Sequence, residues 1–547
     1  MGLKSPVSAC LRFVAATSFV VGLFASGASL SASGQQQTTP PPSPPTAQPQ
    51  QRLDASAAPS VLKVTADEAV KMALENNLGI RAERLGPQIE TYGLAAARAI
   101  YTPALTSRTT TRSATTPNDN FFTGSSSTVT GESFRTNGGL AQFVPWGGGS
   151  YQFGLDGART TTTDESRNYN PQLDSNFFLN FTQPLLRNFR IDANRQNILN
   201  SEKRQQISDL QLRQTLTQTT RNVRNAYYSL LNAMGQLDVA RQSYETAQTQ
   251  LKNNQRRVDV GSMAPIELIQ AQAEVAATEE QVIVAEGQIQ AAEDGLRILI
   301  MNPTQPDFWT TKLEPSERPT LTQRPIDVDA AIANALANRT DLAQARKQIE
   351  QTDISLKYLR NQKLPAIDLN ASYSLVGYAG TQRQFDRSTG VPIVVAESQR
   401  PFGEAVRDVF GNEFKTWQFV FNVSYPIGTS QADASMAQAR LQRDQQQTNL
   451  RDLETLIVAS VRDAARQVQT SLKRVESTQR ARDLALQSLQ AEEKRVSVGM
   501  SDSFRLIQAQ RDLTRQLNNE LNAIIAYNRA LINFEAVQMA PLGGGGF

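Results

Sequence analysis

Few residues in this sequence could perform chemistry. The 547 residues contain no histidine, and the only cysteine is Cys10. Zinc sites and activated nucleophiles are commonly built from these two residue types, and one cysteine cannot form an intramolecular disulfide. We therefore predict that the protein is not an enzyme and that it holds no metal and no other cofactor.

The charged residues are nearly balanced. The sequence has 55 Lys and Arg against 52 Asp and Glu, a net charge of +3, and the two signs are interspersed. A nucleic-acid-binding surface needs basic residues concentrated on one face or along one helix. The charge pattern therefore excludes nucleic acid as a partner.

Residues 1–30 are typical of a secretory signal peptide. Basic residues accompany an apolar run over residues 13–24, and small residues follow it. Val7–Cys10 resembles a lipoprotein box, but such a box should follow the apolar run and here it precedes it. We therefore expect an exported chain from which Cys10 leaves with the signal peptide.

The segments beside the central part of the chain have a biased composition. Residues 31–60 are rich in Pro and Gln and predict a disordered tether, and residues 541–547 form a Gly-rich tail. After residue 24 no run of about 20 apolar residues occurs, so no membrane-spanning helix is expected. If the chain crosses a membrane, it must do so with strands.

One motif occurs twice in the chain. Arg257–Gly261 reads Arg-Val-Asp-Val-Gly, and Arg495–Gly499 reads Arg-Val-Ser-Val-Gly. Leu-Ile-Gln-Ala-Gln follows both motifs, at Leu268–Gln272 and again at Leu506–Gln510, and every pair lies 238 positions apart. A register held without a gap indicates an internal duplication.

The duplication divides the chain into two halves. Shorter motifs recur upstream at a separation of 262 positions, such as Pro103-Ala-Leu and Pro365-Ala-Ile. The halves span residues 61–302 and 326–540, and a Pro-containing linker over residues 303–325 joins them. We predict the same order in each half: a helix, then strands (103–185 and 366–426), then a helical hairpin (191–300 and 432–538).

The helical parts are unusually long. Apolar or small residues recur at steps of three and four over residues 192–260 and 432–498, and no proline interrupts either run. Each run would form a helix of roughly 100 Å, so it must pack against a return helix, at about 265–300 or 503–538, in a coiled-coil hairpin. Gly261 and Gly499 are expected at the hairpin tips, because a glycine in the left-handed conformation ends many helices.

The strand parts alternate between apolar and polar residues. Four runs correspond between the halves, at about 103–112, 175–185, 366–376 and 415–426, and we interpret the polar segments 113–133, 160–176 and 376–413 as loops. The alternation fits strands of a barrel in lipid, and it fits a half-buried soluble sheet equally well. Two further runs, 134–144 and 150–160, would either add a hairpin to the barrel wall or fold outside it.

A barrel in lipid could not be closed by one chain. An open sheet edge leaves unpaired backbone groups in hydrocarbon, and the smallest transmembrane barrels have about eight strands, twice the four corresponding runs. Several chains would have to share the wall. Arg108 and Arg112, which are in phase on the first run, would face the pore or lie near its rim.

In the order of these motifs, residues 61–540 resemble the TolC-type outer-membrane factor family, also called outer membrane efflux proteins. The duplicated hairpin motif, Ala73–Asn76 and the strand-ending Gln183–Leu186 and Tyr425–Gly428 carry the resemblance. It implies an α+β fold in which a transmembrane β-barrel of twelve strands, shared between three chains, continues into a long antiparallel α-helical barrel in the periplasm.

The resemblance also implies a function and partners. It implies a homotrimer in outer-membrane lipid that serves as the passive exit channel of a tripartite efflux or type I secretion system. A periplasmic adaptor (membrane fusion) protein and an inner-membrane pump would be the partners. A periplasmic adaptor or a structural coiled-coil protein is the alternative, although an adaptor would have one hairpin and no duplication.

The resemblance assigns adaptor docking to the hairpin tips, where the family has Val-Gly-Leu. The leucine is missing at both tips here, and the corresponding residues are Val260, Gly261, Ser262, Val498, Gly499 and Met500. The alternative reading is that the two glycines only terminate helices.

The family narrows its periplasmic mouth with acidic side chains six and nine residues after the second glycine. Arg505 and Gln508 stand at those positions here, and Glu267 and Gln270 are their counterparts in the first half. We hypothesise that Glu267 and Arg505 pair across neighbouring hairpins to close this periplasmic gate. The alternative is that both are solvated charges on helix faces.

Overall fold

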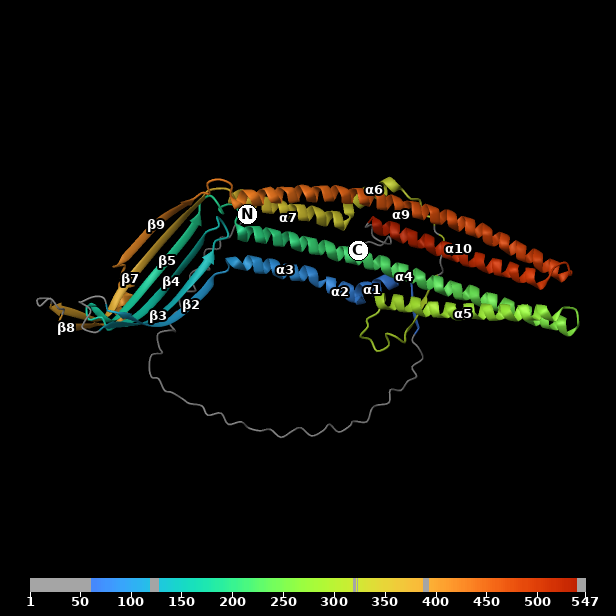
Figure 1. Ribbon diagram of the computed structural model, residues 1–547, viewed down its shortest axis with the longest axis horizontal. Coiled ribbons are helices and arrows are strands. Elements are labelled where there is room, and N and C mark those ends of the chain that lie inside the picture. The colour runs from blue at the N-terminus through green and yellow to red at the C-terminus, as the bar shows by residue number, and fades with distance from the viewer. Residues whose placement is uncertain (1–60, 119–126, 318–320, 322, 387–392, 539–547) are drawn as a thin grey trace, which may run out of the picture. The chain divides into compact units, whose positions relative to one another are not determined.

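The computed structural model describes residues 61–118, 127–317, 321, 323–386 and 393–538 (Figure 1). The expected signal peptide (1–30), the tether (31–60) and the Gly-rich tail (541–547) lie outside these residues. The described chain combines long helices with one large antiparallel sheet, a mixed helical and strand fold.

The large sheet contains seven strands. Its strands follow the order β2-β3-β4-β5-β7-β8, and β9 also pairs with β7. Each pairing is antiparallel. The strands are β2 (Ala104–Pro117), β3 (Thr128–Phe143), β4 (Ser150–Thr162), β5 (Tyr169–Pro184), β7 (Ala366–Asp386), β8 (Ile393–Arg400) and β9 (Lys415–Ser424).

The strands extend further than the alternation predicts. The runs 134–144 and 150–160 belong to β3 and β4, which lie between β2 and β5 in the sheet. The prediction that 113–133, 160–176 and 376–413 are loops is wrong in part. These segments contain strand ends, all of β8 and the helix α8 (Phe402–Gly411). Their Thr, Ser and Gly residues conceal the strands, because a strand with polar residues on both faces shows no alternation.

The two faces of the sheet differ in polarity. One row of directly paired residues crosses the six long strands and is apolar or aromatic throughout: Leu105, Leu140, Phe153, Leu179, Tyr373 and Trp417. The neighbouring row on the opposite face is Ala104, Ala141, Gln152, Asn180, Ser372 and Gln418. Because successive side chains along a strand point to opposite faces, the sheet at the level of these rows has one apolar face and one polar or small-residue face.

Two helical hairpins follow the strands. The first is α4 (Ala193–Asp259) with α5 (Pro265–Ile300), and the second is α9 (Gln431–Ser497) with α10 (Ser503–Val537). Both α4 and α9 have 67 residues, a length of about 100 Å. Figure 1 shows the two helices of each hairpin running side by side.

Side-chain caps set where the long helices begin. The Asp192 side chain accepts a 2.8 Å hydrogen bond from the backbone amide of Arg195 at the start of α4. At the start of α9, Ser430 and Asp433 form a reciprocal capping box. The Lys363 ammonium and Ser430 hold the pKa of Asp433 at about 2. Such caps satisfy amide groups that have no partner inside the helix.

Shorter elements surround the hairpins where the helices are best packed. Parallel pairing joins β1 (Val61–Val64) to β6 (Lys312–Pro315), so part of the expected linker 303–325 forms a strand. The remaining helices are α1 (Ala66–Asn76), α2 (Leu78–Glu83), α3 (Leu85–Arg98), the short 3-10 helix η1 (Ala99–Tyr101), α6 (Val328–Asn338) and α7 (Thr340–Gln362). None of the helices in the described ranges is long and apolar enough to span a bilayer.

Two apolar cores stabilise this region. The first joins α4, α5, α1, β1 and β6 around Tyr227, Leu230 and Ile300, which are fully buried. The second joins α6, α7, α9 and α10 around Val461 and Tyr527, which are also fully buried. Burying a side chain of this size stabilises a fold by about 1.5–3 kcal/mol. The hairpins are therefore anchored far from their tips.

Candidate functional site: the helical hairpin tips

The backbone reverses in the same way at both tips. Gly261 has a φ of 72° and Gly499 a φ of 74°. The Gly261 amide donates to the Val258 carbonyl at 2.9 Å, and the Ser262 amide donates to the Arg257 carbonyl at 2.8 Å. This pair of bonds is a Schellman motif, which satisfies the last carbonyl groups of a helix.

The second tip repeats the motif. The amide of Gly499 donates to the Val496 carbonyl at 3.3 Å, and the amide of Met500 donates to the Arg495 carbonyl at 2.8 Å. A Cβ atom at either glycine would have no atom within 4 Å. Positive φ, and not lack of space, is therefore the reason for glycine here.

The two tips differ in their side chains. Met500 is 77% exposed and stands where the first tip has Ser262. Phe504, 61% exposed, stands where the first tip has Ile266, and a valine precedes each glycine. Exposed apolar side chains at a chain reversal are a surface on which a partner protein can pack. Both tips therefore expose apolar side chains, although at different positions.

The four expected gate residues lie in the first turns of α5 and α10. Glu267 is half-buried, and Gln270, Arg505 and Gln508 are exposed. A carboxylate near a helix N-terminus is favoured by the helix dipole, and a guanidinium there is not. Among the described residues of one chain, no ion pair joins Glu267 to Arg505. Their pairing across neighbouring hairpins stays a prediction.

An ion pair that the sequence did not reveal joins the two hairpins close to the tips. Arg511 of α10 donates through Nε to Glu274 of α5, at 2.8 Å from Oε2 and 3.1 Å from Oε1. Its Nη2 also donates to the same carboxylate. The Glu274 carboxylate is buried, and its hydrogen bonds raise the pKa of Arg511. A guanidinium group that binds one carboxylate through two nitrogen atoms holds both side chains in a defined orientation.

A sequence signal for this ion pair does exist. Glu274 lies between Ala271 and Thr278, both buried, in the stripe of α5 that faces its neighbours. A charged residue inside a stripe of buried residues predicts a charged partner on another element, because an unpaired buried charge is costly. The stripe does not say which of the arginines is that partner.

Polar side chains continue this contact between α4 and α10. Asn254 donates to Ser503 at 3.4 Å, and both are almost fully buried. Farther from the tips, Ser243 and Thr514 are hydrogen-bonded at 2.7 Å, and Gln236 donates to Asn522 at 3.3 Å. We call these contacts, together with Glu274–Arg511, the polar seam. It adds a few directional bonds to the apolar packing between the hairpins, such as that of Leu521 and Ile525 against α4.

The part of the chain that the structure describes has no cluster of three or more metal-ligating side chains. The titratable groups at the tips include the solvent-facing Asp502 and Arg505 and the half-buried Glu267. The tips therefore present exposed apolar side chains, and the polar seam connects the two hairpins.

Residues 141–300 and 331–537, more than half of the chain, match the family described as outer membrane efflux protein. No curated protein matches the chain.

Several solved structures have the same fold. The CmeC outer membrane channel of Campylobacter jejuni is 14% identical and aligns over 89% of this chain and 90% of its own, with a TM-score of 0.62. VceC of Vibrio cholerae is 14% identical, with coverages of 86% and 96% and a TM-score of 0.59. The open state of the MtrE outer membrane channel of Neisseria gonorrhoeae is 14% identical, with coverages of 89% and 93% and a TM-score of 0.58.

Proposed function

The chain belongs to the outer membrane efflux protein family, which places it in the outer membrane with a periplasmic helical part, and we propose that three copies form one passive channel from the periplasm to the exterior. The channel serves a tripartite efflux or type I secretion system. Cargo passes through it, and the energy comes from an inner-membrane pump.

The observation that carries this proposal is the sheet with two open edges and one apolar face. Among the described residues, β2 pairs with β3 alone and β9 with β7 alone. The row from Leu105 to Trp417 gives the sheet a face suited to lipid. Backbone groups at a sheet edge cannot stay unpaired in hydrocarbon. Three copies joined edge to edge would satisfy both edges and enclose a lumen lined by the polar face.

The hairpins continue the channel as a helical barrel in the periplasm. The equal lengths of α4 and α9 and the matching tip motifs support an origin by duplication of one unit. A chain with two such hairpins contributes twice to a helical wall. Long hairpins packed side by side bury their apolar stripes without a globular core.

The alternative functions fit less well. A periplasmic adaptor or a structural coiled-coil protein would use the hairpins, but neither would need a sheet with an apolar outer face next to them. Exposed aromatic residues on β9, such as Trp417 (68% exposed) and Phe421 (64%), would be a liability in a protein surrounded by water.

The tips contact a periplasmic adaptor. Val260, Val498 and Met500 are exposed in the absence of a partner, at 76%, 67% and 77%. Apolar side chains that are well packed at the centre of an interface supply most of its binding energy. The adaptor would connect the channel to the pump.

The periplasmic gate lies one to three turns inside the tips. In the closed state we place Glu267 of one chain against Arg505 of its neighbour, next to the Glu274–Arg511 pair within each chain. An exposed pair contributes at most about 1 kcal/mol, but three of them at one mouth act together. Single-channel recordings of Glu267→Gln and Arg505→Gln in planar bilayers test this pairing. Unchanged opening in both variants would exclude it.

Fractionation and mass test the proposed function itself. We expect the protein to stay with the outer membrane after salt and carbonate washing. After extraction in detergent, light scattering should give the protein mass of three chains. A chain that washes off the membrane, or one that is extracted as a monomer, would contradict the channel.

A further inference from the structure

The strands β3 and β4 have no counterpart in the second half of the chain. We propose that they form part of the membrane wall, so that three copies close a barrel of eighteen strands instead of the twelve that the resemblance implies. The inference rests on the proposed function, because it assumes three copies around one lumen.

One apolar row continues without interruption through both strands. Leu140 of β3 and Phe153 of β4 are directly paired, and they connect Leu105 of β2 to Leu179 of β5. The next row along the strands adds Leu155. A hairpin folded outside the wall would not keep the register of this lipid-facing row, since a slip of one residue turns every side chain to the other face.

The opposite face of the hairpin is as polar as a lumen requires. Asn137 of β3 pairs with Asp156 of β4, and Arg108 of β2 completes the same row. Arg135 forms an ion pair with Asp156 at 3.6 Å. Charged side chains on the lipid face of a barrel are costly at membrane depth, whereas on the lumen face they are ordinary.

A pair of glycines permits the sheet to curve at this hairpin. Gly139 and Gly154 are direct partners on the polar face. A Cβ atom on Gly139 would lie 2.7 Å from the Phe153 carbonyl oxygen, and one on Gly154 would lie 2.6 Å from that of Gly138. Strand glycines at such close approaches mark the bends by which a sheet closes into a barrel.

The turn that joins β3 to β4 is fixed to the start of the helical part. Gly147 and Gly148 both have positive φ values, 70° and 68°. The buried Gln183 donates to the Gly147 carbonyl at 2.7 Å. A Cβ atom on Gly148 would lie 2.4 Å from the Asn188 carbonyl oxygen, so the turn rests directly on the chain that leads into α4. This end of the hairpin cannot swing away from the wall.

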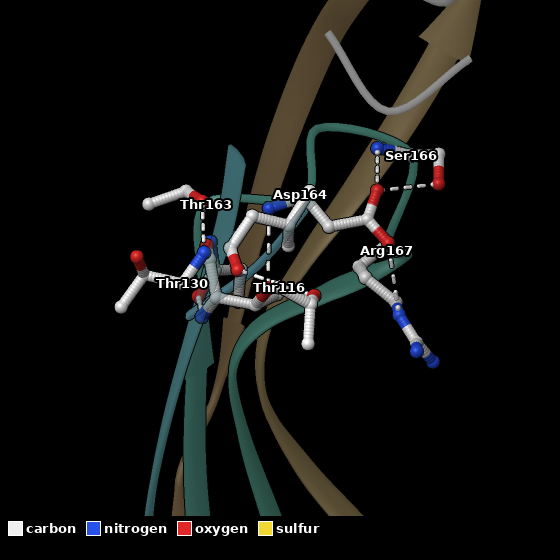
Figure 2. A network of polar contacts seen from close by, with 9 residues as sticks. Thr116, Thr130, Thr163, Asp164, Ser166 and Arg167 are labelled. Atoms are coloured by element: carbon white, nitrogen blue, oxygen red, sulfur yellow. Dashed lines mark hydrogen bonds and ion pairs between the residues drawn. The ribbon is translucent and has the colours of Figure 1, made fainter. Parts of the chain in front are cut away.

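The other end is tied to its neighbours by a polar network (Figure 2). The Thr130 side chain of β3 is hydrogen-bonded to that of Thr115 of β2 at 2.9 Å. The backbone of Thr130 also forms two hydrogen bonds of 2.9 Å with Thr163, just after β4. In the following turn, Asp164 accepts from the Ser166 amide at 2.9 Å and forms a 3.3 Å ion pair with Arg167. Both ends of the inserted hairpin are therefore built into the sheet.

The strand count also permits closure. β8 and β9 lie one after the other along the same side of β7, pairing at Gly380–Asp386 and Ala366–Leu375, so they fill one position in the wall. Each chain then has six positions that alternate in direction. The edges β2 and β9 run in opposite directions, and neighbouring copies can join by the antiparallel pairing that outer-membrane barrels use.

The extra hairpin widens the pore in the membrane. Strands about 4.8 Å apart and tilted by about 40° give a backbone diameter of about 36 Å for eighteen strands and about 24 Å for twelve. The barrel in the membrane would then be wider than the periplasmic mouth. The mouth would be the narrowest point of the channel, and it would limit the size of the cargo.

Quenching by brominated lipid tests the inference. Single cysteines are introduced into a Cys10→Ser chain at Leu140 and Phe153, on the lipid-facing row, and labelled with a small fluorophore. Leu179→Cys on β5 is the reference in the same row, and Gln152→Cys on the polar face is the matched control. We expect Leu140→Cys and Phe153→Cys to lose as much fluorescence as Leu179→Cys, and Gln152→Cys to lose none.

The other outcomes separate the two proposals. Quenching at Leu179→Cys without quenching at Leu140→Cys and Phe153→Cys would overturn the eighteen-stranded wall and leave the channel standing. No quenching at Leu179→Cys would remove the sheet from the membrane, and the proposed function would fall with it. Sedimentation as a trimer in detergent shows for each variant that the chain has folded.

Discussion

The hairpins are built differently at their two ends. Around the middle of α4, where α5 ends, large apolar side chains such as Tyr227, Leu230 and Ile300 fill a core shared by several elements. Near the tips, the buried positions include the polar Asn254 and Glu274 beside Leu506 and Ile507, so hydrogen bonds accompany a smaller amount of apolar packing. One end is suited to holding the chain together, and the other to separating without loss of the fold.

This difference shows where movement is possible. Regions with few buried apolar contacts open at lower free energy than the core of the same protein. A contact made of a few hydrogen bonds also has a defined broken state, in which water replaces each partner. Opening of the mouth would therefore begin in the polar seam, while the apolar cores stay intact.

The largest expected effect lies in the core. Leu230→Ala removes a fully buried side chain from the first core and should destabilise the fold by about 2–5 kcal/mol. Thermal unfolding of the trimer measures the loss. The matched control is Ile269→Ala in α5 near the tip, where the side chain is 59% exposed and should matter little. Equal losses in the two variants would show that the ends do not differ.

Breaking the seam should have a smaller effect on stability and a larger one on opening. Glu274→Gln and Arg511→Gln each remove the charge from one partner, a loss of about 1–3 kcal/mol for a hydrogen-bonded charge pair. We expect longer and more frequent openings in planar bilayers. Arg515→Gln, one turn farther along α10 on an exposed side chain, is the control. If both seam variants open as often and for as long as the wild-type channel, the polar seam does not hold the mouth closed.

Replacing either tip glycine should destabilise its tip, because both glycines have a positive φ that other residues rarely adopt. Gly261→Ala and Gly499→Ala should each cost about 1–2 kcal/mol locally, because a side chain disfavours the left-handed conformation. Gly287→Ala inside α5, where a Cβ atom would have open space, should instead stabilise by about 0.5–1 kcal/mol. Limited proteolysis at the tips reports the local loss. Equal cleavage of all three variants would contradict the role of φ.

The smallest expected effect on the fold comes from the exposed tip side chains. Met500→Ser should leave thermal unfolding unchanged, since the side chain contacts little in the chain itself. Its adaptor affinity should fall about tenfold, the equivalent of roughly 1.4 kcal/mol of lost apolar burial. Ser262→Ala at the same place on the first tip is the control. Unaltered binding by Met500→Ser would remove the second tip from the docking surface.

Much of the helical part follows from the sequence, because its signals are local. The three-and-four spacing and the cap residues predict α4 and α9 to within two residues at either end. Gly261 and Gly499 predict the reversals, since a left-handed residue is needed at the end of each helix. These features depend on neighbours within one turn of the chain.

The sheet and the seam depend on distant partners and were harder to predict. In β2, the predicted run 103–112 covers most of the strand, but the polar residues that follow it show no alternation, and the continuation to Pro117 is evident only from its pairing with β3. Arg511 is one of several arginines on α10, and nothing near it in sequence selects Glu274 as its partner. The expected pairing of Glu267 with Arg505 across neighbouring hairpins stays a prediction.

The symmetry of the detergent-solubilised particle tests the central claim most directly. Single-particle imaging should show threefold symmetry, with six wall strands in each third of a membrane ring and a helical stalk that ends in the tips. A particle made of a single chain, or one without threefold symmetry, would contradict the shared channel.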